Sequence, residues 1–202
     1  MTERKMTQTA GQTVGPYFAY CLTPGPYGRN GVASNVLAGP ETQGERLVLT
    51  GRLLDGEGNP MDDALIEVWQ ANAAGRYRHP ADDRDSVALD PAFSGFGRCM
   101  TDSNGRFTFE TVKPGRVPGQ GNRLQAPHIS LIIHSRGMQS HAFGRVYFSD
   151  EVAANDEDPV LAVVEPARRP TLIARREDAP GGVVYHFDIH IQGPQETVFF
   201  DA

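Results

Sequence analysis

The sequence predicts a mostly β fold: an antiparallel β-sandwich core with long loops and one or two short helices. The clearest observation is residues 183–192, where apolar and polar side chains alternate almost without error. Other strand-like segments are separated by turns rich in Gly, Pro and Asn, a spacing typical of sandwiches. Signals for helices are few. At 202 residues, the chain is long enough to form one domain with a sizeable core.

Four further strands are expected ahead of the alternating segment. The first two cover 46–55 and 64–70 and are joined across a turn rich in Gly, Asn and Pro. The next two cover 106–111 and 128–135, each following a segment with strong turn residues. With the segment 183–192, they supply the strands of the predicted sandwich.

Helices are expected only near residue 160. Asp158 ahead of Pro159 provides an N-cap and a first-turn proline, so a short helix is predicted over 160–165. A single helical turn is also expected over 150–155. No repeat or low-complexity segment interrupts the chain.

The N-terminal part of the chain has a different character from the rest. Residues 23–40 are rich in Gly and Pro and show no periodicity, which is compatible with a flexible surface loop or with a segment that packs on a partner chain. We therefore divide the single domain into an arm with loops over 1–45 and a β-sandwich over 46–202.

The charge balance excludes several function classes. The formal net charge of -6 argues against a surface for nucleic acid or anionic lipid. The longest apolar runs are far shorter than a membrane span, and the first residues contain no apolar stretch of the signal-peptide type. A cytoplasmic location is therefore expected.

Several motifs in a consistent order resemble one enzyme family. They are Gly75-Arg76-Tyr77 at the end of a Trp-containing strand, Phe93-Ser94-Gly95-Phe96-Gly97-Arg98, Ala126-Pro127-His128-Ile129-Ser130 and Phe187-Asp188-Ile189-His190-Ile191-Gln192-Gly193. Together they resemble the intradiol aromatic-ring dioxygenases, and within that family the α subunits of its protocatechuate-cleaving, hetero-oligomeric members. The resemblance extends from Gln12 to the end of the chain.

The resemblance implies an incomplete iron site on this chain. Metal-bearing members of the family hold Fe(III) with two tyrosines and two histidines, and Tyr77 and His128 match the first of each kind. The second tyrosine belongs just after Lys113-Pro114-Gly115, where this chain has Arg116-Val117-Pro118, and the second histidine position holds Ser130. A tyrosinate and one imidazole leave half the coordination sphere of this hard cation empty.

We therefore predict that this chain binds no metal and that Tyr77 and His128 are vestigial ligand positions. The residues by themselves also fit an ordinary interpretation, in which Tyr77 is a hydrogen-bonded phenol and His128 a satisfied imidazole at a strand end. By resemblance, Fe(III) is held by a β subunit, which is the expected partner, and no catalytic residue is expected on this chain.

Two segments are candidates for substrate contact. By resemblance, the segment with Thr13, Gly15, Pro16 and Tyr17 reaches the mouth of the active site on the neighbouring β chain, where a bare, stiff backbone can approach a ligand closely. A plain turn is the alternative. Arg136 stands where the family's α chain places an arginine toward the substrate carboxylate, although a solvated loop arginine fits the sequence equally well.

The resemblance implies a function in the breakdown of aromatic compounds. Protocatechuate and O₂ would become 3-carboxy-cis,cis-muconate on the iron of the β subunit, while this chain shapes the substrate pocket. The resemblance also favours packing of the N-terminal arm on the partner chain over a flexible surface loop. A non-catalytic scaffold or interaction protein of the same fold is the alternative. A self-sufficient homomeric dioxygenase would need ligands that this chain lacks.

Overall fold

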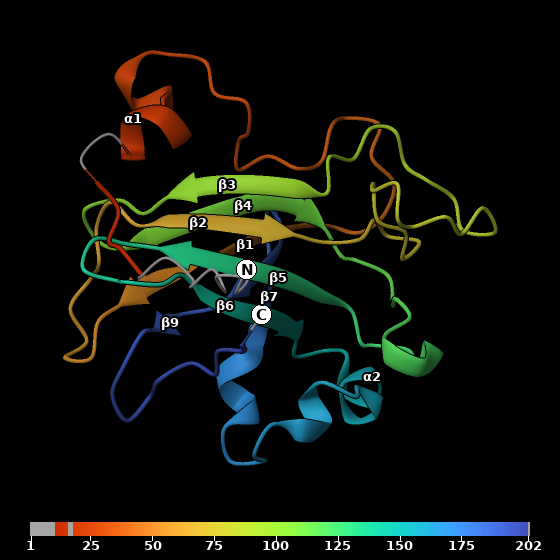
Figure 1. The fold of residues 1–202 in the computed structure, drawn as a ribbon. Coiled ribbons are helices and arrows are strands. Elements are labelled where there is room, and N and C mark those ends of the chain that lie inside the picture. The colour runs from red at the N-terminus through yellow and green to blue at the C-terminus, as the bar shows by residue number, and fades with distance from the viewer. Residues whose placement is uncertain (1–10, 16–17, 202) are drawn as a thin grey trace, which may run out of the picture.

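The fold is built around one large mixed β-sheet. The computed structural model describes residues 11–15 and 18–201. In that part of the chain nine strands form a sheet with the order β3-β2-β5-β6-β7-β8-β1-β4, and β9 pairs with β1 (Figure 1). The strands are β1 (Arg46–Leu54), β2 (Leu65–Trp69), β3 (Phe96–Met100), β4 (Arg106–Val112), β5 (His128–His134), β6 (Ala142–Phe148), β7 (Ile173–Ala179), β8 (Gly182–His186) and β9 (Ile189–His190).

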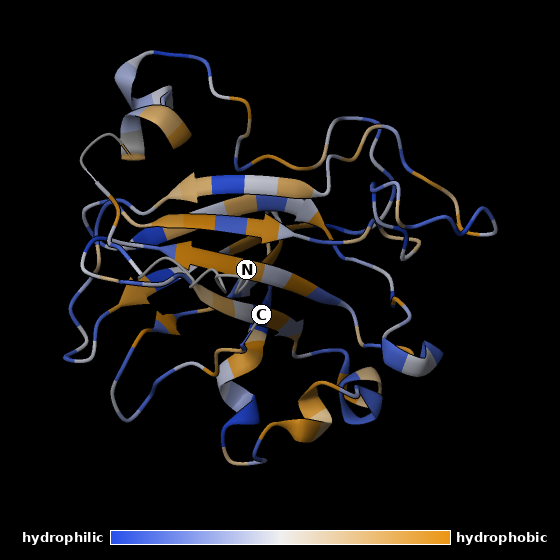
Figure 2. Cartoon of the chain, viewed as in Figure 1, coloured by the Kyte–Doolittle hydropathy of each residue, from blue (hydrophilic) through white to orange (hydrophobic). Residues whose placement is uncertain are grey.

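A single core joins the two halves of this sheet. Its side chains come from β1, β4 and β8 on one side, such as Leu49 and Phe109, and from β2 and β5 on the other, such as Ile66 and Leu131. In β4 the buried residues Phe107 and Phe109 alternate with Thr108 and Glu110, which are more exposed, and Figure 2 shows apolar and polar residues along the strands. The mostly β, sandwich-like prediction is confirmed. The pairings β1–β8, β1–β9 and β6–β7 are parallel.

The alternating segment 183–192 forms two strands. Tyr185, Phe187 and Ile189 are buried, as the alternation predicts. The strand is interrupted at Phe187 and Asp188. There the Asp188 side chain, in place of a backbone carbonyl, accepts a hydrogen bond from the Arg52 backbone amide at 2.8 Å. Sequence periodicity identified the inward face correctly and missed the interruption.

The helices are short and only partly as predicted. The α-helices are α1 (Phe18–Leu22) and α2 (Val152–Glu157), with 3₁₀ turns η1 (Gly25–Tyr27), η2 (Gln120–Asn122), η3 (Leu161–Val163) and η4 (Arg169–Leu172). The helix expected over 160–165 is wrong: only η3 forms there. The N-cap residue of η3 is Val160, and Asp158 Oδ1 accepts hydrogen bonds from the amides of Val160 and Leu161 at 2.8 Å. None of the helices in the described residues is long and apolar enough to span a membrane.

The Gly- and Pro-rich segment 23–40 packs partly on the chain itself. Leu37 and Ala38 are buried in the core, and the Leu37 amide donates to the Glu110 carbonyl. Residues earlier in this segment carry exposed apolar side chains, including Tyr27 and Val32. Neither a free loop nor a wholly partner-bound arm describes the segment.

Strand β5 runs between two opposite ends of the molecule. We call the end with the β1–β2 turn, the β5–β6 turn and residues 11–15 the arm end; it lies at the left in Figure 1. We call the opposite end the pocket end, where the loops 70–95 and 113–127 lie. A seven-residue strand such as β5 separates them by about 23 Å.

Candidate functional site

A tight turn after β2 presents Tyr77 at the pocket end. Gly75 has φ +82°, and a Cβ there would lie 2.2 Å from the Arg116 carbonyl oxygen, so only glycine fits. The Gly75 amide donates to the Asn72 carbonyl, and the Asn72 side-chain oxygen accepts the Arg76 amide, both at 2.9 Å. The glycine of the Gly-x-Tyr motif is therefore required by the backbone conformation of the turn, whether or not a metal is bound.

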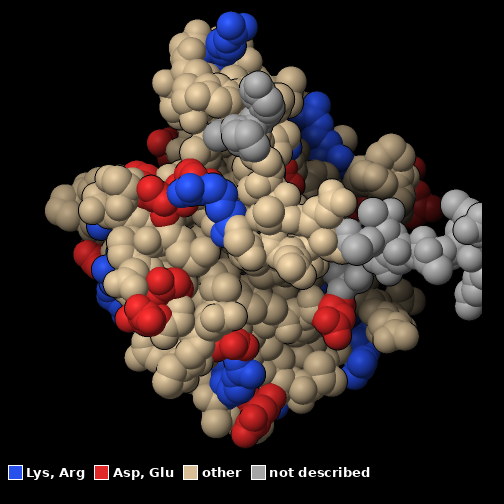
Figure 3. All heavy atoms as spheres, turned by 60° about the vertical axis from the view of Figure 1, so that its left-hand side comes forward, with Lys and Arg blue, Asp and Glu red and all other residues tan. Residues whose placement is uncertain are grey.

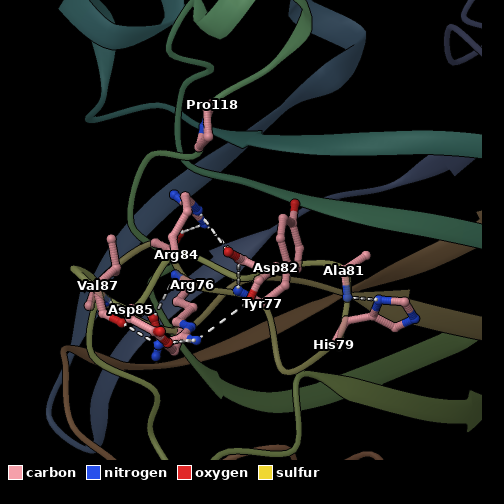
Figure 4. Close-up of polar contacts among 12 residues, drawn as sticks. Arg76, Tyr77, His79, Ala81, Asp82, Arg84, Asp85, Val87 and Pro118 are labelled. Atoms are coloured by element: carbon pink, nitrogen blue, oxygen red, sulfur yellow. Dashed lines mark hydrogen bonds and ion pairs between the residues drawn. The ribbon is translucent and has the colours of Figure 1, made fainter.

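The Tyr77 ring stacks on Trp69, and the Tyr77 backbone amide is bound by an ion-paired carboxylate. It stacks on Trp69 with ring centroids 5.8 Å apart, and its amide donates to Asp82 at 2.8 Å. Asp82 pairs with Arg84, whose hydrogen bond lowers the pKa of Asp82 to about 2 (Figure 4). Burial raises the pKa of Tyr77, so the phenol is neutral near pH 7. In Figure 4 its hydroxyl points away from Asp82.

Tyr77 lines a cavity together with Val117, which lies in the segment where the resemblance places the second tyrosine. The cavity has a volume of about 460 Å³, and Val117, 2% exposed, lines it together with Tyr77. Its lining residues are Trp69, Tyr77, His79, Ala81, Asp82, Asp83, Arg84, Val117, Pro118 and Asn122. The structure thus brings Tyr77 and Val117 to the same cavity.

His128 is a buried imidazole whose Nδ1 is hydrogen-bonded. It begins β5, is 4% exposed, and its Nδ1–H donates to the Ala126 carbonyl at 2.8 Å. Burial, helped by the charge of Arg145, lowers the pKa of His128 to about 4. The ordinary interpretation of this residue is thereby supported: its hydrogen bond and its neutral state need no metal.

Ser130 lies two residues along β5 from His128 and so on the same face of the sheet. We call Tyr77, Val117, His128 and Ser130, the positions that the resemblance relates to the four iron ligands, the remnant site. Its donors are one neutral phenol, one imidazole and one hydroxyl, which do not fit ferric iron. In the described part of the chain, no three His, Cys, Asp or Glu side chains are grouped to hold a metal ion.

The buried His128 makes stability depend on pH. The folded chain keeps this imidazole neutral down to about pH 4, whereas the unfolded chain takes up a proton below about pH 6.5. The unfolded state therefore binds more protons between these values, and the free energy of unfolding should fall by about 3 kcal/mol as the pH drops from 6.5 to 4. Denaturant titrations of the wild-type chain and of His128→Asn across this range would measure the difference. The exposed His79→Asn is the control, and an unchanged slope in His128→Asn would contradict the prediction.

Arg136 lies at the arm end, far from the remnant site. Its side chain is 68% exposed and pairs with Asp62 at 3.4 Å and with Asp63 at 2.7 Å. The hydrogen bond to Asp63 and, to a smaller extent, the charge of Asp62 raise the pKa of Arg136, so its guanidinium stays positively charged. Figure 3 brings this end forward and shows acidic and basic side chains adjoining over the surface.

The N-terminal segment packs beside Arg136. Thr13 Oγ1 accepts the Gly137 amide at 2.9 Å, and Gly11 lies so close to Gln139 that a Cβ would meet its carbonyl oxygen at 2.5 Å. Gly15 is exposed, with open space around its Cα. Pro16 and Tyr17 lie outside the described residues. The structure thus gathers Thr13 and Arg136 on one surface and separates both from Tyr77 and His128.

Sequence reasoning missed three residues that surround the remnant site. Arg145 and Tyr147 stand on β6 opposite Ser130 and His128, respectively. Asp158 is fully buried and accepts the Tyr147 hydroxyl at 3.2 Å. Arg145 stands within the apolar run 142–148, and a charged residue in such a run could have indicated a functional role. Its neighbours, however, depend on strand register, which the sequence does not reveal.

Comparisons with known proteins agree with this arrangement. The protein family described as Dioxygenase matches residues 13–193. The protocatechuate 3,4-dioxygenase alpha chain of Burkholderia cepacia is 49% identical over 202 residues, covering 98% of both chains. The beta chain from the same organism is 39% identical over 173 residues, covering 82% of this chain and 72% of that one.

A solved structure shows the same fold. The intradiol ring-cleavage dioxygenase of Tetranychus urticae superposes with a TM-score of 0.62 at 20% identity, covering 96% of this chain and 98% of the other. With the family match over most of the chain and the identity to the alpha chain over nearly all of it, this protein belongs to the intradiol dioxygenase family.

Proposed function

We propose that this chain is the α subunit of a protocatechuate 3,4-dioxygenase. The observation that carries the proposal is the 49% identity to an alpha chain across 98% of both sequences. The enzyme would join protocatechuate and O₂ and open the ring between its two hydroxyl-bearing carbons, which gives 3-carboxy-cis,cis-muconate. Both oxygen atoms enter the product, so no other reductant is required.

The proposal assigns the ferric iron to a β subunit. Support comes from the remnant site, where Val117 and Ser130 occupy two ligand positions and His128 is held by the Ala126 carbonyl. A beta chain of such an enzyme is homologous to this chain, which is the kind of partner that the proposal requires. This chain would then influence catalysis only through the residues that it places around the active site of the β subunit.

The arm end is the surface proposed to face the substrate. Thr13, Gly15 and Arg136 are exposed there, and the fixed contact between Thr13 and Gly137 orients the N-terminal segment toward the same side. Pro16 and Tyr17 continue that segment. Since Arg136 uses Nε and Nη2 for Asp63 and Asp62, its Nη1 is available for a carboxylate on the substrate.

Ring cleavage by assembled and separate subunits tests this function. The chain alone should convert no protocatechuate, and the β subunit alone should be much less active than the pair, because it lacks the pocket wall supplied here. The coexpressed pair should convert protocatechuate to 3-carboxy-cis,cis-muconate. The loss of protocatechuate absorbance would measure this conversion. A β subunit that is fully active alone would favour the scaffold alternative.

A further inference from the structure

A positively charged side chain lies beside the position of the lost histidine. In the sheet, Ser130 of β5 pairs with Trp69 of β2 on one side and with Arg145 of β6 on the other. Directly paired residues of antiparallel strands project from the same face, with Cβ atoms about 5 Å apart. Trp69 in turn stacks on Tyr77. Arg145 therefore belongs to the same group of side chains as the remnant site.

The charge of Arg145 acts on the retained ligand residues. It contributes to the lowered pKa of His128, after burial, and it opposes the burial that raises the pKa of Tyr77. It also opposes the rise in the pKa of Tyr147, the residue paired with His128. These effects come from one cation and extend to both retained ligand positions.

Neutral groups hold this cation in place. Arg145 Nη1 donates to the Gln125 side-chain oxygen at 2.5 Å, and no carboxylate of the described residues forms an ion pair with it. The buried carboxylate of this region, Asp158, is hydrogen-bonded to Tyr147 and to backbone amides. The guanidinium thus brings a positive charge that no ion pair with the described residues cancels.

We propose that the guanidinium of Arg145 replaces the positive charge of the ferric ion in this chain and excludes a metal cation from the remnant site. A second cation within a few ångströms would be repelled in a partly buried environment where screening is weak. The loss of two ligands and the presence of Arg145 are then separate barriers. Restoring the ligands alone should leave the site without metal.

Ligand restoration with and without Arg145 tests the proposal. The full chain carrying Val117→Tyr and Ser130→His is compared with the same chain that also carries Arg145→Gln. Both are incubated with ferric citrate, desalted, and assayed for bound iron and for tyrosinate-to-iron absorption. We expect less than about 0.1 iron per chain with Arg145 present and about one without it, accompanied by the absorption band.

Three controls separate charge from other effects. Arg145→Lys in the ligand-restored chain keeps the charge and should bind no iron, and the exposed Arg123→Gln makes the same change of net charge elsewhere and should also bind none. Arg145→Met replaces Arg145→Gln if the latter does not give a cooperative thermal transition. Stoichiometric iron with Arg145 or Lys at this position overturns the proposal, as does the absence of iron from the folded Arg145→Gln and Arg145→Met chains.

Discussion

Arg136→Ala, introduced into this chain and assembled with the β subunit, is expected to lower kcat/KM for protocatechuate roughly ten- to a hundredfold while changing catechol cleavage little. Only protocatechuate carries the carboxylate that a guanidinium would bind. A direct contact of this kind is worth about 1.5–3 kcal/mol when it is shielded from water, and the exposed Arg136 becomes shielded only if the partner covers it. Steady-state kinetics with both substrates would measure the effect.

Arg136→Lys distinguishes two forms of this contact. Lysine keeps the charge and loses the planar fork, so partial recovery would indicate a field effect and no recovery a bidentate contact. Equal losses for protocatechuate and catechol would instead mean that Arg136 supports the fold or the subunit contact. In that case it would have to be withdrawn as a substrate residue.

Asp158→Ala should destabilise the chain by about 3–5 kcal/mol. Asp158 is 0% exposed and accepts four hydrogen bonds, from the amides of Ala126, Val160 and Leu161 and from the Tyr147 hydroxyl. Alanine would leave these buried donors without an acceptor and would open a gap in the small apolar cluster around Tyr147. The midpoint and slope of a urea titration would give the change in the free energy of unfolding.

The matched control is Asp156→Ala. Asp156 is exposed on α2, two residues away, and its loss should change the free energy of unfolding by less than about 0.5 kcal/mol. A loss in Asp158→Ala that is no larger than in the control would show that water satisfies the buried donors. The network around Tyr147 would then have no special part in stability.

Local patterns predicted the inward faces of the strands but not their partners. The alternation over 183–192 correctly placed Tyr185, Phe187 and Ile189 in the core, because side-chain direction follows from the backbone itself. The interruption at Asp188 depends on Arg52, a residue 136 positions away in the sequence. The helix expected after Asp158 forms only as the 3₁₀ turn Leu161–Val163, although Asp158 accepts hydrogen bonds from the amides of Val160 and Leu161.

For the candidate site, the sequence predicted the residues that lie within recognisable motifs and missed those outside them. By resemblance, the sequence predicted an incomplete ligand set that keeps Tyr77 and His128, and this stays a prediction. The structure places Tyr77 and Val117 on one cavity. The length of β5 already implied that Arg136 lies far from His128. Arg145 could not be placed, since only the register of β5 with β6 brings it next to Ser130.

Iron analysis of the chain alone and of the αβ complex tests most directly the claim that this chain contributes to a metal enzyme without holding the metal. We predict less than about 0.1 iron in the isolated chain, no tyrosinate-to-iron absorption, and about one iron per αβ pair. About one iron per isolated chain together with that absorption, or about two irons per pair, would contradict the account.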